Sequence, residues 1–209
     1  MNTEAVLFDL DGTLVDSLPL IVRTYRQVFS EMNIPWGNDD VVKMIGLPLK
    51  DIGRRFVGEA APVFEERYQY YYHQDHDYYT RLFPGTLEML ESLKGQDIRL
   101  GIVTSKGKPG TTRTAAFTKL DGYMDVVITA HDVARHKPDP EPLLTALATL
   151  PARAERTIFI GDSSYDILTG KNAGCLTLGV AWGLDSRTEL EKLSPDGILE
   201  SWEELQAYL

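Results

Sequence analysis

Two carboxylates that follow a short apolar run are the residues in this sequence whose types and spacing best suit chemistry. Residues 5–8 are unbroken apolar, as expected for a strand buried on both faces of a parallel sheet, and Asp9 and Asp11 follow. Alternation along an extended chain puts both carboxylates on the same side. Carboxylates this close repel each other and stay ionised when a cation such as Mg²⁺ lies between them. Gly12 and Thr13 then turn the chain and let its backbone approach a ligand, although a plain polar turn uses the same residue types.

Two further apolar runs end in residues that could hold phosphate. Thr104, Ser105 and Lys106 follow a strand predicted over 99–104, and a hydroxyl with the N–H groups after it can bind phosphate oxygens. The same Thr-Ser pair would also serve as an ordinary helix cap. Lys137 precedes a proline and therefore lies in an extended segment before the next helix. A lysine fixed there would neutralise a carboxylate or a phosphoryl group, whereas single lysines are more often solvated.

The fourth strand end carries two more carboxylates. Residues 158–161 are an apolar run ending in glycine, Asp162 follows at once, and Asp166 falls in the first turn of the next predicted helix. Asp162 or Ser163 would also suit an N-cap of that helix. Each simple alternative is reasonable alone, but four such strand ends in a consistent order favour one shared site.

The elements that must position these residues alternate along most of the chain. Strands are predicted over 5–8, 99–104, 125–129, 157–161, 176–180 and 197–199, and helices over 86–94, 109–120, 139–150, 165–172 and from 202. Strands that alternate with helices predict an α/β fold with a Rossmann-like parallel sheet, in which ligands bind beyond the carboxyl ends of the strands. Helical patterns alone occur between 18 and 82, including 18–32, where Asp16 or Ser17 could cap the first helix. The prediction is a catalytic core of residues 1–15 and 84–209 with an all-helical insertion over 16–83.

Composition limits the partners and the compartment. The 209 residues carry a net charge of −10, which argues against nucleic acid or an anionic membrane as the partner. No apolar run approaches membrane-spanning length, and the first strand begins too early for a signal peptide. Cys175 is the single cysteine, lies among apolar neighbours and reads as a core residue. We therefore expect a cytoplasmic protein.

These motifs together resemble those of the haloacid dehalogenase superfamily, and the insertion resembles its C1-type helical cap. The resemblance covers essentially the whole chain and is carried by Asp9-x-Asp11-Gly12-Thr13, Thr104, Lys137 and Gly161-Asp162-x-x-x-Asp166. It implies a Mg²⁺-dependent hydrolase in which Asp9 forms an aspartyl-phosphate and Asp11 acts as general acid and base. The implied metal ligands are Asp9, Asp11 through its backbone carbonyl, Asp162 and Asp166. The implied phosphate- and substrate-binding residues are Gly12, Thr104, Ser105, Lys106, Lys137, Gly46 and Lys50.

The substrate is less well indicated than the reaction. Dehalogenases of the superfamily lack the second motif carboxylate, so the presence of Asp11 favours phosphoryl transfer. The closer resemblance is to phosphoglycolate phosphatases and PpaX-type inorganic pyrophosphatases, and is carried by residues 104–106, 125–132, 137–142, 172–174 and 179–183. A small anionic phosphate ester, phosphoglycolate-like, is the first expectation, and pyrophosphate is the alternative. A phosphosugar mutase and a non-catalytic phosphate sensor are further alternatives, and the chain is expected to be a monomer or homodimer.

The cap offers several candidate specificity residues. The loop over 45–49 contains Gly46 and is expected to face the catalytic site, where a substrate carboxylate or second phosphate could meet nearby basic residues. These are Lys43, Lys50, Arg54 and Arg55, with Lys106 facing the loop from the core. The tyrosines between 68 and 79 match helical spacing and are expected to pack within the cap. His73 and His76 have a spacing that a metal could use, but a structural role is expected.

Overall fold

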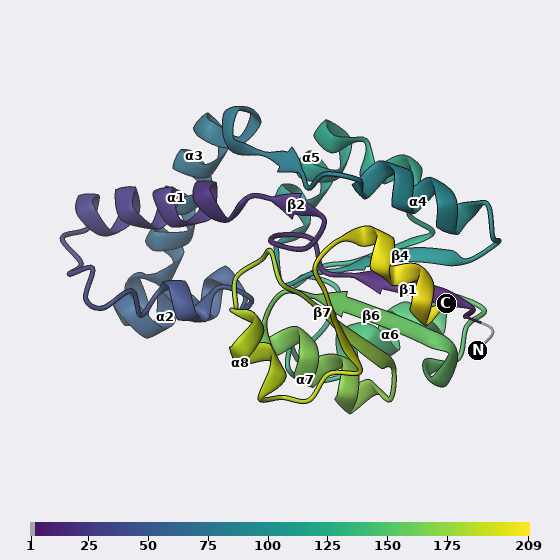
Figure 1. Cartoon of the computed structure of the whole chain (residues 1–209). Helices are drawn as coiled ribbons and strands as arrows, with labels where there is room; N and C mark the ends of the chain where they lie inside the picture. Colours follow the sequence, from purple (N-terminus) through teal and green to yellow (C-terminus); the bar gives the residue numbers. More distant parts are fainter. Residues whose placement is uncertain (1–2) are drawn as a thin grey trace.

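A six-stranded parallel sheet forms the centre of the molecule in the computed structural model, which describes residues 3–209. Figure 1 shows β1 in the middle of the sheet, and the strand order is β5-β4-β1-β6-β7-β8. The bounds are β1 Ala5–Phe8, β4 Arg99–Val103, β5 Val126–Ile128, β6 Thr157–Gly161, β7 Leu176–Val180 and β8 Gly197–Leu199. The chain therefore has the α/β Rossmann-like fold that the sequence predicts.

Alternation along the strands builds a core on each face of the sheet. Val6 and Phe8 of β1 pack on one face, beneath α4, α5 and the C-terminal 3₁₀ segment. Ala5 and Leu7 point to the opposite face, beneath α6. The covering helices are α4 Thr86–Lys94, α5 Lys108–Thr118, α6 Glu141–Thr149, α7 Ser164–Ala173 and α8 Arg187–Glu191, with 3₁₀ segments Leu120–Gly122, Ala154–Arg156 and Trp202–Tyr208. β1 is buried on both faces, and the chain leaves the core at its carboxyl end, where Asp9 follows.

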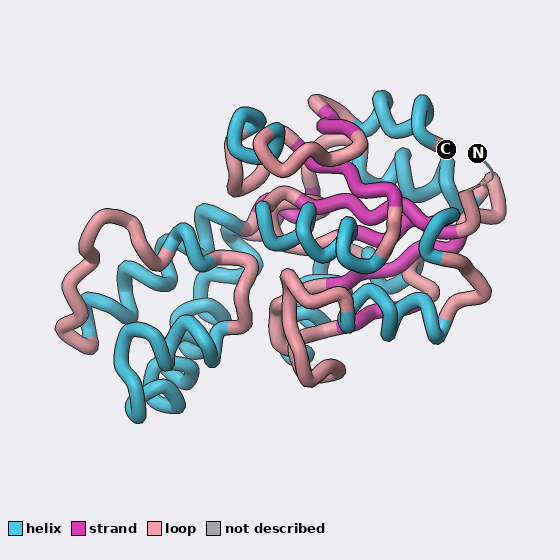
Figure 2. The backbone as a smooth tube through the Cα atoms, turned by 90° about the horizontal axis from the view of Figure 1, so that it is seen from below, coloured by secondary structure: helices cyan, strands magenta, loops and turns pink. Residues whose placement is uncertain are grey.

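Three helices pack together beside the sheet and form a second apolar cluster (Figure 2). They are α1 Leu18–Glu31, α2 Leu49–Val57 and α3 Ala61–Tyr79, with 3₁₀ turns Val42–Met44 and Gly58–Ala60. Tyr25 of α1 stacks on Phe64 of α3 with ring centroids 6.2 Å apart, and Phe29 of α1 meets the same ring edge to face at 6.1 Å. We call this unit, residues 16–83, the cap, and we call residues 1–15 and 84–209 the core; the boundary between them stays a proposal.

A short antiparallel ribbon links the cap to the core. β2 Val15–Asp16 pairs with β3 Arg81–Leu82, so the chain enters and leaves the cap side by side. The sequence-based prediction that no strand occurs between 18 and 82 was therefore wrong at Arg81 and Leu82. Two residues are too few to show an alternating pattern, and their pairing depends on a partner far away in the sequence.

The remaining predicted elements agree with the structure to within a few residues at their ends. The strands 157–161, 176–180 and 197–199 and the helix 86–94 have the predicted bounds. The last helix, predicted from 202, is a 3₁₀ helix over Trp202–Tyr208 instead. Among the described residues no helix is both long and apolar enough to cross a membrane.

Candidate active site

The chemistry-bearing residues converge at the carboxyl edge of three adjacent strands. Phe8 of β1 lies in register with Ile102 of β4 and Ile160 of β6, so all three strands end at the same level. The backbone N–H of Asp9 donates to the carbonyl of Ile160 at 2.8 Å, which fixes the position of Asp9. Lys137 comes from the loop that follows β5, the edge strand next to β4. One edge of the sheet thus collects side chains that are more than 100 positions apart in the sequence.

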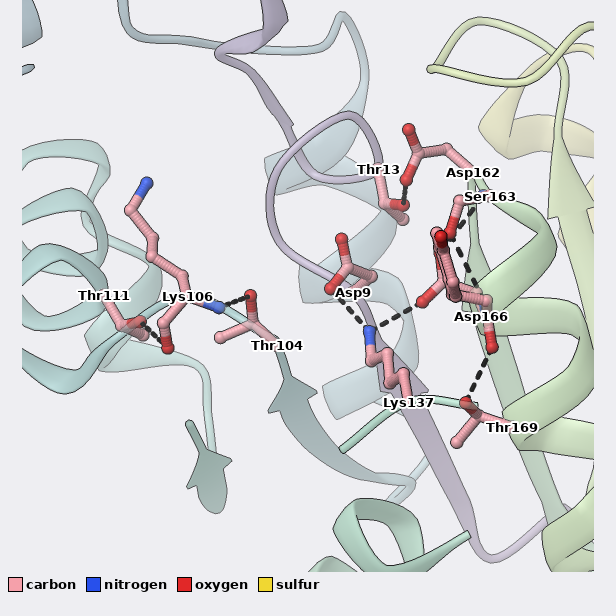
Figure 3. A network of polar contacts seen from close by, with 11 residues as sticks. Asp9, Thr13, Thr104, Lys106, Thr111, Lys137, Asp162, Ser163, Asp166 and Thr169 are labelled. Carbon is pink, nitrogen blue, oxygen red and sulfur yellow. Dashed lines mark hydrogen bonds and ion pairs between the residues drawn. The ribbon is translucent and has the colours of Figure 1, made fainter. Parts of the chain in front are cut away.

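Lys137 is the cation at the centre of this edge (Figure 3). Its Nζ donates to Asp9 Oδ1 at 2.7 Å and to Asp166 Oδ1 at 2.6 Å, and its side chain is 2% exposed. Burial alone would lower the pKa of Lys137, but the carboxylates of Asp166 and Asp9 hold that pKa above its usual value. The lysine is therefore not the solvated surface residue that was the simpler alternative.

Three buried carboxylates, Asp9, Asp162 and Asp166, lie close together, and Lys137 contacts Asp9 and Asp166. Each offers an oxygen within 4.8 Å of the others, the single grouping of this kind in residues 3–209. Burial raises the pKa of Asp9 to about 7 against the opposing effect of Lys137, and burial with the nearby Asp166 raises the pKa of Asp162. One lysine does not balance three carboxylates, so the site is short of positive charge. A hard divalent cation such as Mg²⁺, which prefers carboxylate oxygens, fits this donor set.

The loops hold Asp162 and Asp166 in fixed orientations. Asp162 accepts from Thr13 Oγ1 at 3.2 Å and from the backbone N–H of Leu184 at 2.7 Å. Asp166 accepts from the N–H and hydroxyl of Ser163, which in turn caps α7 in a capping box. The helix-cap alternative for Ser163 is therefore correct, and Asp166 contributes to both the cap and the cluster.

Two glycines allow the loops to approach the cluster. Gly12 has φ +86°, and a Cβ there would lie 2.1 Å from Asp162 Oδ2. A Cβ at Gly183 would lie equally close, 2.1 Å from the Cβ of Asp162. No side chain fits in either place, so Gly12 contributes through its backbone.

Asp11 is held on one oxygen by two donors. Its Oδ1 accepts from Ser17 Oγ at 2.6 Å and from Lys106 Nζ at 2.8 Å. Ser17 occupies the N-cap position of α1 but makes no capping hydrogen bond with its side chain, so the expected cap is replaced by this contact with Asp11. Lys106 also donates to the hydroxyl of Tyr72 on α3 at 2.5 Å, which joins the cap to the core beside Asp11.

The residues after β4 are arranged as a hydroxyl pair. Thr104 Oγ1 accepts from the backbone N–H of Lys106 at 3.2 Å. Ser105 Oγ is buried and has no hydrogen-bond partner among the described residues. A buried hydroxyl without a partner is costly, so this atom is suited to a ligand oxygen.

A cavity of about 90 Å³ lies between these groups and the cap. Its core side includes Asp9, Asp11, Thr104, Ser105, Lys106 and Asp162, and its cap side includes Ile21, Tyr25, Ile45, Gly46, Leu47, Leu49, Tyr68, Gln69 and Tyr72. Gly46 has φ +106°, and a Cβ there would meet the Tyr165 ring at 2.8 Å, so the cap loop sits directly on the core. Lys50 is exposed and does not line the cavity, and its proposed contact with substrate gains no support from this geometry.

The histidines and some tyrosines have roles that the sequence indicated only in part. His76 is buried and its ring nitrogens contact Asp77 and Thr114, whereas His73 contacts Arg113. The two histidines therefore join α3 to α5 and share no candidate metal site in the part of the chain described. Tyr72 was expected to pack within the cap, and it does so while its hydroxyl also reaches the site.

Several cap residues around the site were not predicted as site residues. They reach Asp11 or the cavity, and they include Ser17, Tyr25, Tyr68, Gln69 and Tyr72. The i, i+4 spacing of Tyr68 and Tyr72 did indicate a common helix face, but no sequence signal showed that this face is directed at the core.

Comparison with known proteins identifies the family of the chain. Residues 6–180 match the family model described as haloacid dehalogenase-like hydrolase, and the chain belongs to that family. Pyrophosphatase PpaX of Anoxybacillus flavithermus is 36% identical over 100% of this chain and 98% of its own, and pyrophosphatase PpaX of Bacillus mycoides is 34% identical over 98% and 96%. A haloacid dehalogenase-like family hydrolase from Streptococcus pneumoniae superposes with a TM-score of 0.84 at 27% identity, covering 99% and 98% of the two chains. A predicted phosphoglycolate phosphatase from Haemophilus somnus superposes with a TM-score of 0.90 at 24% identity over 100% and 98%, which shows a shared fold.

Proposed function

We propose that this protein is a Mg²⁺-dependent phosphatase that hydrolyses a small phosphate monoester through an aspartyl-phosphate on Asp9. The observation that carries the proposal is the grouping of Asp9, Asp162 and Asp166, two of which a buried lysine contacts, near the further carboxylate Asp11. A nucleophile, a second acid–base group and a phosphate site whose charge a lysine and a metal ion can balance are the parts that phosphoryl transfer requires.

Asp9 acts as the nucleophile. Lys137 holds its Oδ1, which orients the carboxylate and leaves Oδ2 directed at the phosphorus of a bound ester. Attack forms the bond between Asp9 and phosphorus while the bond between phosphorus and the leaving oxygen breaks. Water then cleaves the acyl phosphate, which releases inorganic phosphate and restores the carboxylate.

Asp11 moves the protons. Ser17 and Lys106 both donate to its Oδ1, so the other oxygen is available to give a proton to the leaving alcohol and then to take one from water. Because both donors contact the same oxygen, they set the direction in which that second oxygen points.

The metal would be held by Asp9, Asp162 and Asp166, with the backbone carbonyl of Asp11 as a further ligand. When bound, Mg²⁺ supplies positive charge that offsets the carboxylates and the phosphoryl oxygens. The phosphoryl oxygens are bound by Lys137, the hydroxyls of Thr104 and Ser105, and the backbone at Gly12.

Pyrophosphate hydrolysis is the second candidate, because the curated relatives at 36% and 34% identity are named pyrophosphatase PpaX. The same residues would perform it, with phosphate as the leaving group. A phosphosugar mutase would pass the phosphoryl group to a sugar hydroxyl, and a phosphate sensor would bind without turnover. We further propose that the enzyme works in the cytoplasm as a monomer or homodimer.

The test is release of inorganic phosphate with and without Mg²⁺ from p-nitrophenyl phosphate, 2-phosphoglycolate and pyrophosphate. We expect Mg²⁺-dependent turnover of a monoester and its loss in Asp9→Asn, which keeps the shape of the side chain but removes the nucleophile. Turnover by Asp9→Asn equal to that of the wild type would refute the nucleophile assignment. The absence of turnover from all substrates would favour the sensor.

A further inference from the structure

The wall of the cavity that faces Asp11 is aromatic. Tyr25 of α1 and Tyr68 and Tyr72 of α3 form a continuous row, with ring centroids 4.9 Å apart for the first pair and 5.8 Å for the second. All three side chains are buried, and all three line the cavity. A leaving group attached to a phosphoryl group at Asp9 would be placed between Asp11 and this row.

The cavity has little free positive charge on that side. Among residues 3–209 that line it, Lys106 is the single cation, and its Nζ is already held by Asp11 at 2.8 Å and by Tyr72 at 2.5 Å. The basic residues of the cap lie elsewhere: Lys43 pairs with Asp40 at the surface, and Lys50, Arg54 and Arg55 are exposed and do not line the cavity. The cap side of the lining is made of apolar and aromatic residues with one amide, that of Gln69.

An anionic leaving group would therefore enter an unfavourable environment. Its carboxylate or second phosphate would lose water against an apolar and aromatic wall, and Lys106 already donates to Asp11 and Tyr72. A neutral leaving group avoids most of this desolvation. Its hydroxyl groups could bond with the tyrosine hydroxyls, the Gln69 amide or Ser105 Oγ, which has no partner in the described structure.

The size of the cavity limits the leaving group further. At about 90 Å³ it is smaller than an apolar cavity of ~150 Å³ that binds benzene. With the cap in this position, this space suits a phosphoryl group that carries a small leaving group.

We propose that the substrate of this site is a phosphate monoester of a small neutral alcohol, and that carboxylate-bearing esters and pyrophosphate are disfavoured by the tyrosine row and by the commitment of Lys106 to Asp11. The proposal rests on the phosphatase function proposed above. In the reaction the ester oxygen leaves phosphorus as the free alcohol with the proton from Asp11, and water supplies the oxygen and protons that restore both aspartates and complete inorganic phosphate.

The test uses two esters of matched size, 2-hydroxyethyl phosphate and 2-phosphoglycolate, which differ in whether a neutral hydroxymethyl or a carboxylate group ends the chain. Pyrophosphate is measured beside them, all with the full-length enzyme and Mg²⁺. We expect kcat/KM for 2-hydroxyethyl phosphate to exceed both others by tenfold or more. Equal or better turnover of 2-phosphoglycolate or pyrophosphate would overturn the inference and leave the phosphatase function intact. Turnover of p-nitrophenyl phosphate alone would do the same, whereas no phosphate release from any substrate would refute the proposed function itself.

A variant that adds a positive charge to the cavity wall tests whether the lack of a free cation causes the preference for neutral esters. Leu47 lines the cavity from the cap loop, so Leu47→Lys places a cation beside the leaving group, and Leu47→Gln is the neutral polar control. We expect the ratio of kcat/KM for 2-phosphoglycolate to that for 2-hydroxyethyl phosphate to rise at least tenfold in Leu47→Lys and to change less than threefold in Leu47→Gln. Equal ratios in a folded Leu47→Lys protein and the wild type would contradict the electrostatic explanation. The comparison of the two esters on the unmodified enzyme stands even if the variant fails to fold.

Discussion

Replacing Lys137 by methionine should destabilise the protein through the two carboxylates it leaves without a partner. The side chains of Lys137 and Asp166 are 2% and 3% exposed and that of Asp9 is 11% exposed, so solvent screens these ion pairs weakly. Removing one partner of a buried ion pair costs about 3–5 kcal/mol, whereas an exposed pair contributes about 0–1 kcal/mol. Without metal, we expect the free energy of unfolding to fall by about 3 kcal/mol. This is the lower end of that range, because a carboxyl group left without its partner can take up a proton.

The pH dependence of that loss follows from the same carboxyl groups. Burial already raises the folded-state pKa of Asp9 to about 7, and without the opposing lysine it rises further. A carboxyl group whose folded-state pKa is raised destabilises the fold as pH increases above its unfolded value, because the folded protein then holds an uncompensated charge. The variant should therefore lose less stability at pH 5 than at pH 8, and added Mg²⁺ should recover part of the loss at pH 8.

Urea unfolding in EDTA measures the effect. Trp182 and Trp202 pack edge to face in the core with centroids 4.9 Å apart, so tryptophan fluorescence reports on this region. Lys108→Met is the matched control, since that lysine is 67% exposed and lies 3.9 Å from Asp132, and we expect it to change stability by less than about 0.5 kcal/mol. A loss below about 1 kcal/mol for Lys137→Met, unchanged between pH 5 and pH 8, would refute the buried-charge reasoning.

Three further substitutions or treatments test other parts of the structure. Ser17→Ala removes a hydrogen bond to the Asp11 carboxylate and should lower kcat about tenfold, with recovery in Ser17→Thr; unchanged kcat would contradict the positioning role. Gly46→Ala, where a Cβ would lie 2.8 Å from a tyrosine ring and φ is +106°, should raise KM in steady-state assays; Gly58→Ala also has positive φ but has open space for a Cβ, and should leave KM unchanged. Cys175 is buried and burial raises its pKa to about 12, so a thiol reagent should modify it in urea but only slowly in the folded protein; rapid modification without urea would contradict its core position.

The fold could be predicted largely from local patterns. The apolar run before Asp9 and the alternation of strands and helices after residue 84 were sufficient for the parallel sheet, because buried parallel strands and amphipathic helices have distinct periodicities. The β3 strand at Arg81 and Leu82 was not predicted, since its only cause is pairing with a segment that lies 65 residues earlier in the sequence. The final helix was predicted, but its 3₁₀ geometry was not.

The core side of the site could be predicted from the sequence for a related reason. Polar residues that directly follow parallel strands meet at one edge, so Asp9, Thr104 and Asp162 could be grouped from sequence positions alone. Asp166 belongs both to the cap of α7 and to the carboxylate cluster, which shows why an ordinary helix cap was also a reasonable interpretation of this segment. A capping residue and a ligand can be the same side chain when the helix begins at the sheet edge.

The cap side of the site could not be predicted in this way. Its residues reach the site because the cap packs against the core, and not because they follow the strands of a sheet. Basic residues near Gly46 suggested an anionic substrate group, yet Lys50 points to solvent and the cavity wall is formed by Tyr25, Tyr68 and Tyr72. Long charged side chains on a helix favour water, and aromatic ones favour the interface. The same preference that stabilises the contact between cap and core therefore also determines what the cavity offers a substrate. We therefore expect this wall, rather than the four core motifs, to determine selectivity between neutral and anionic esters.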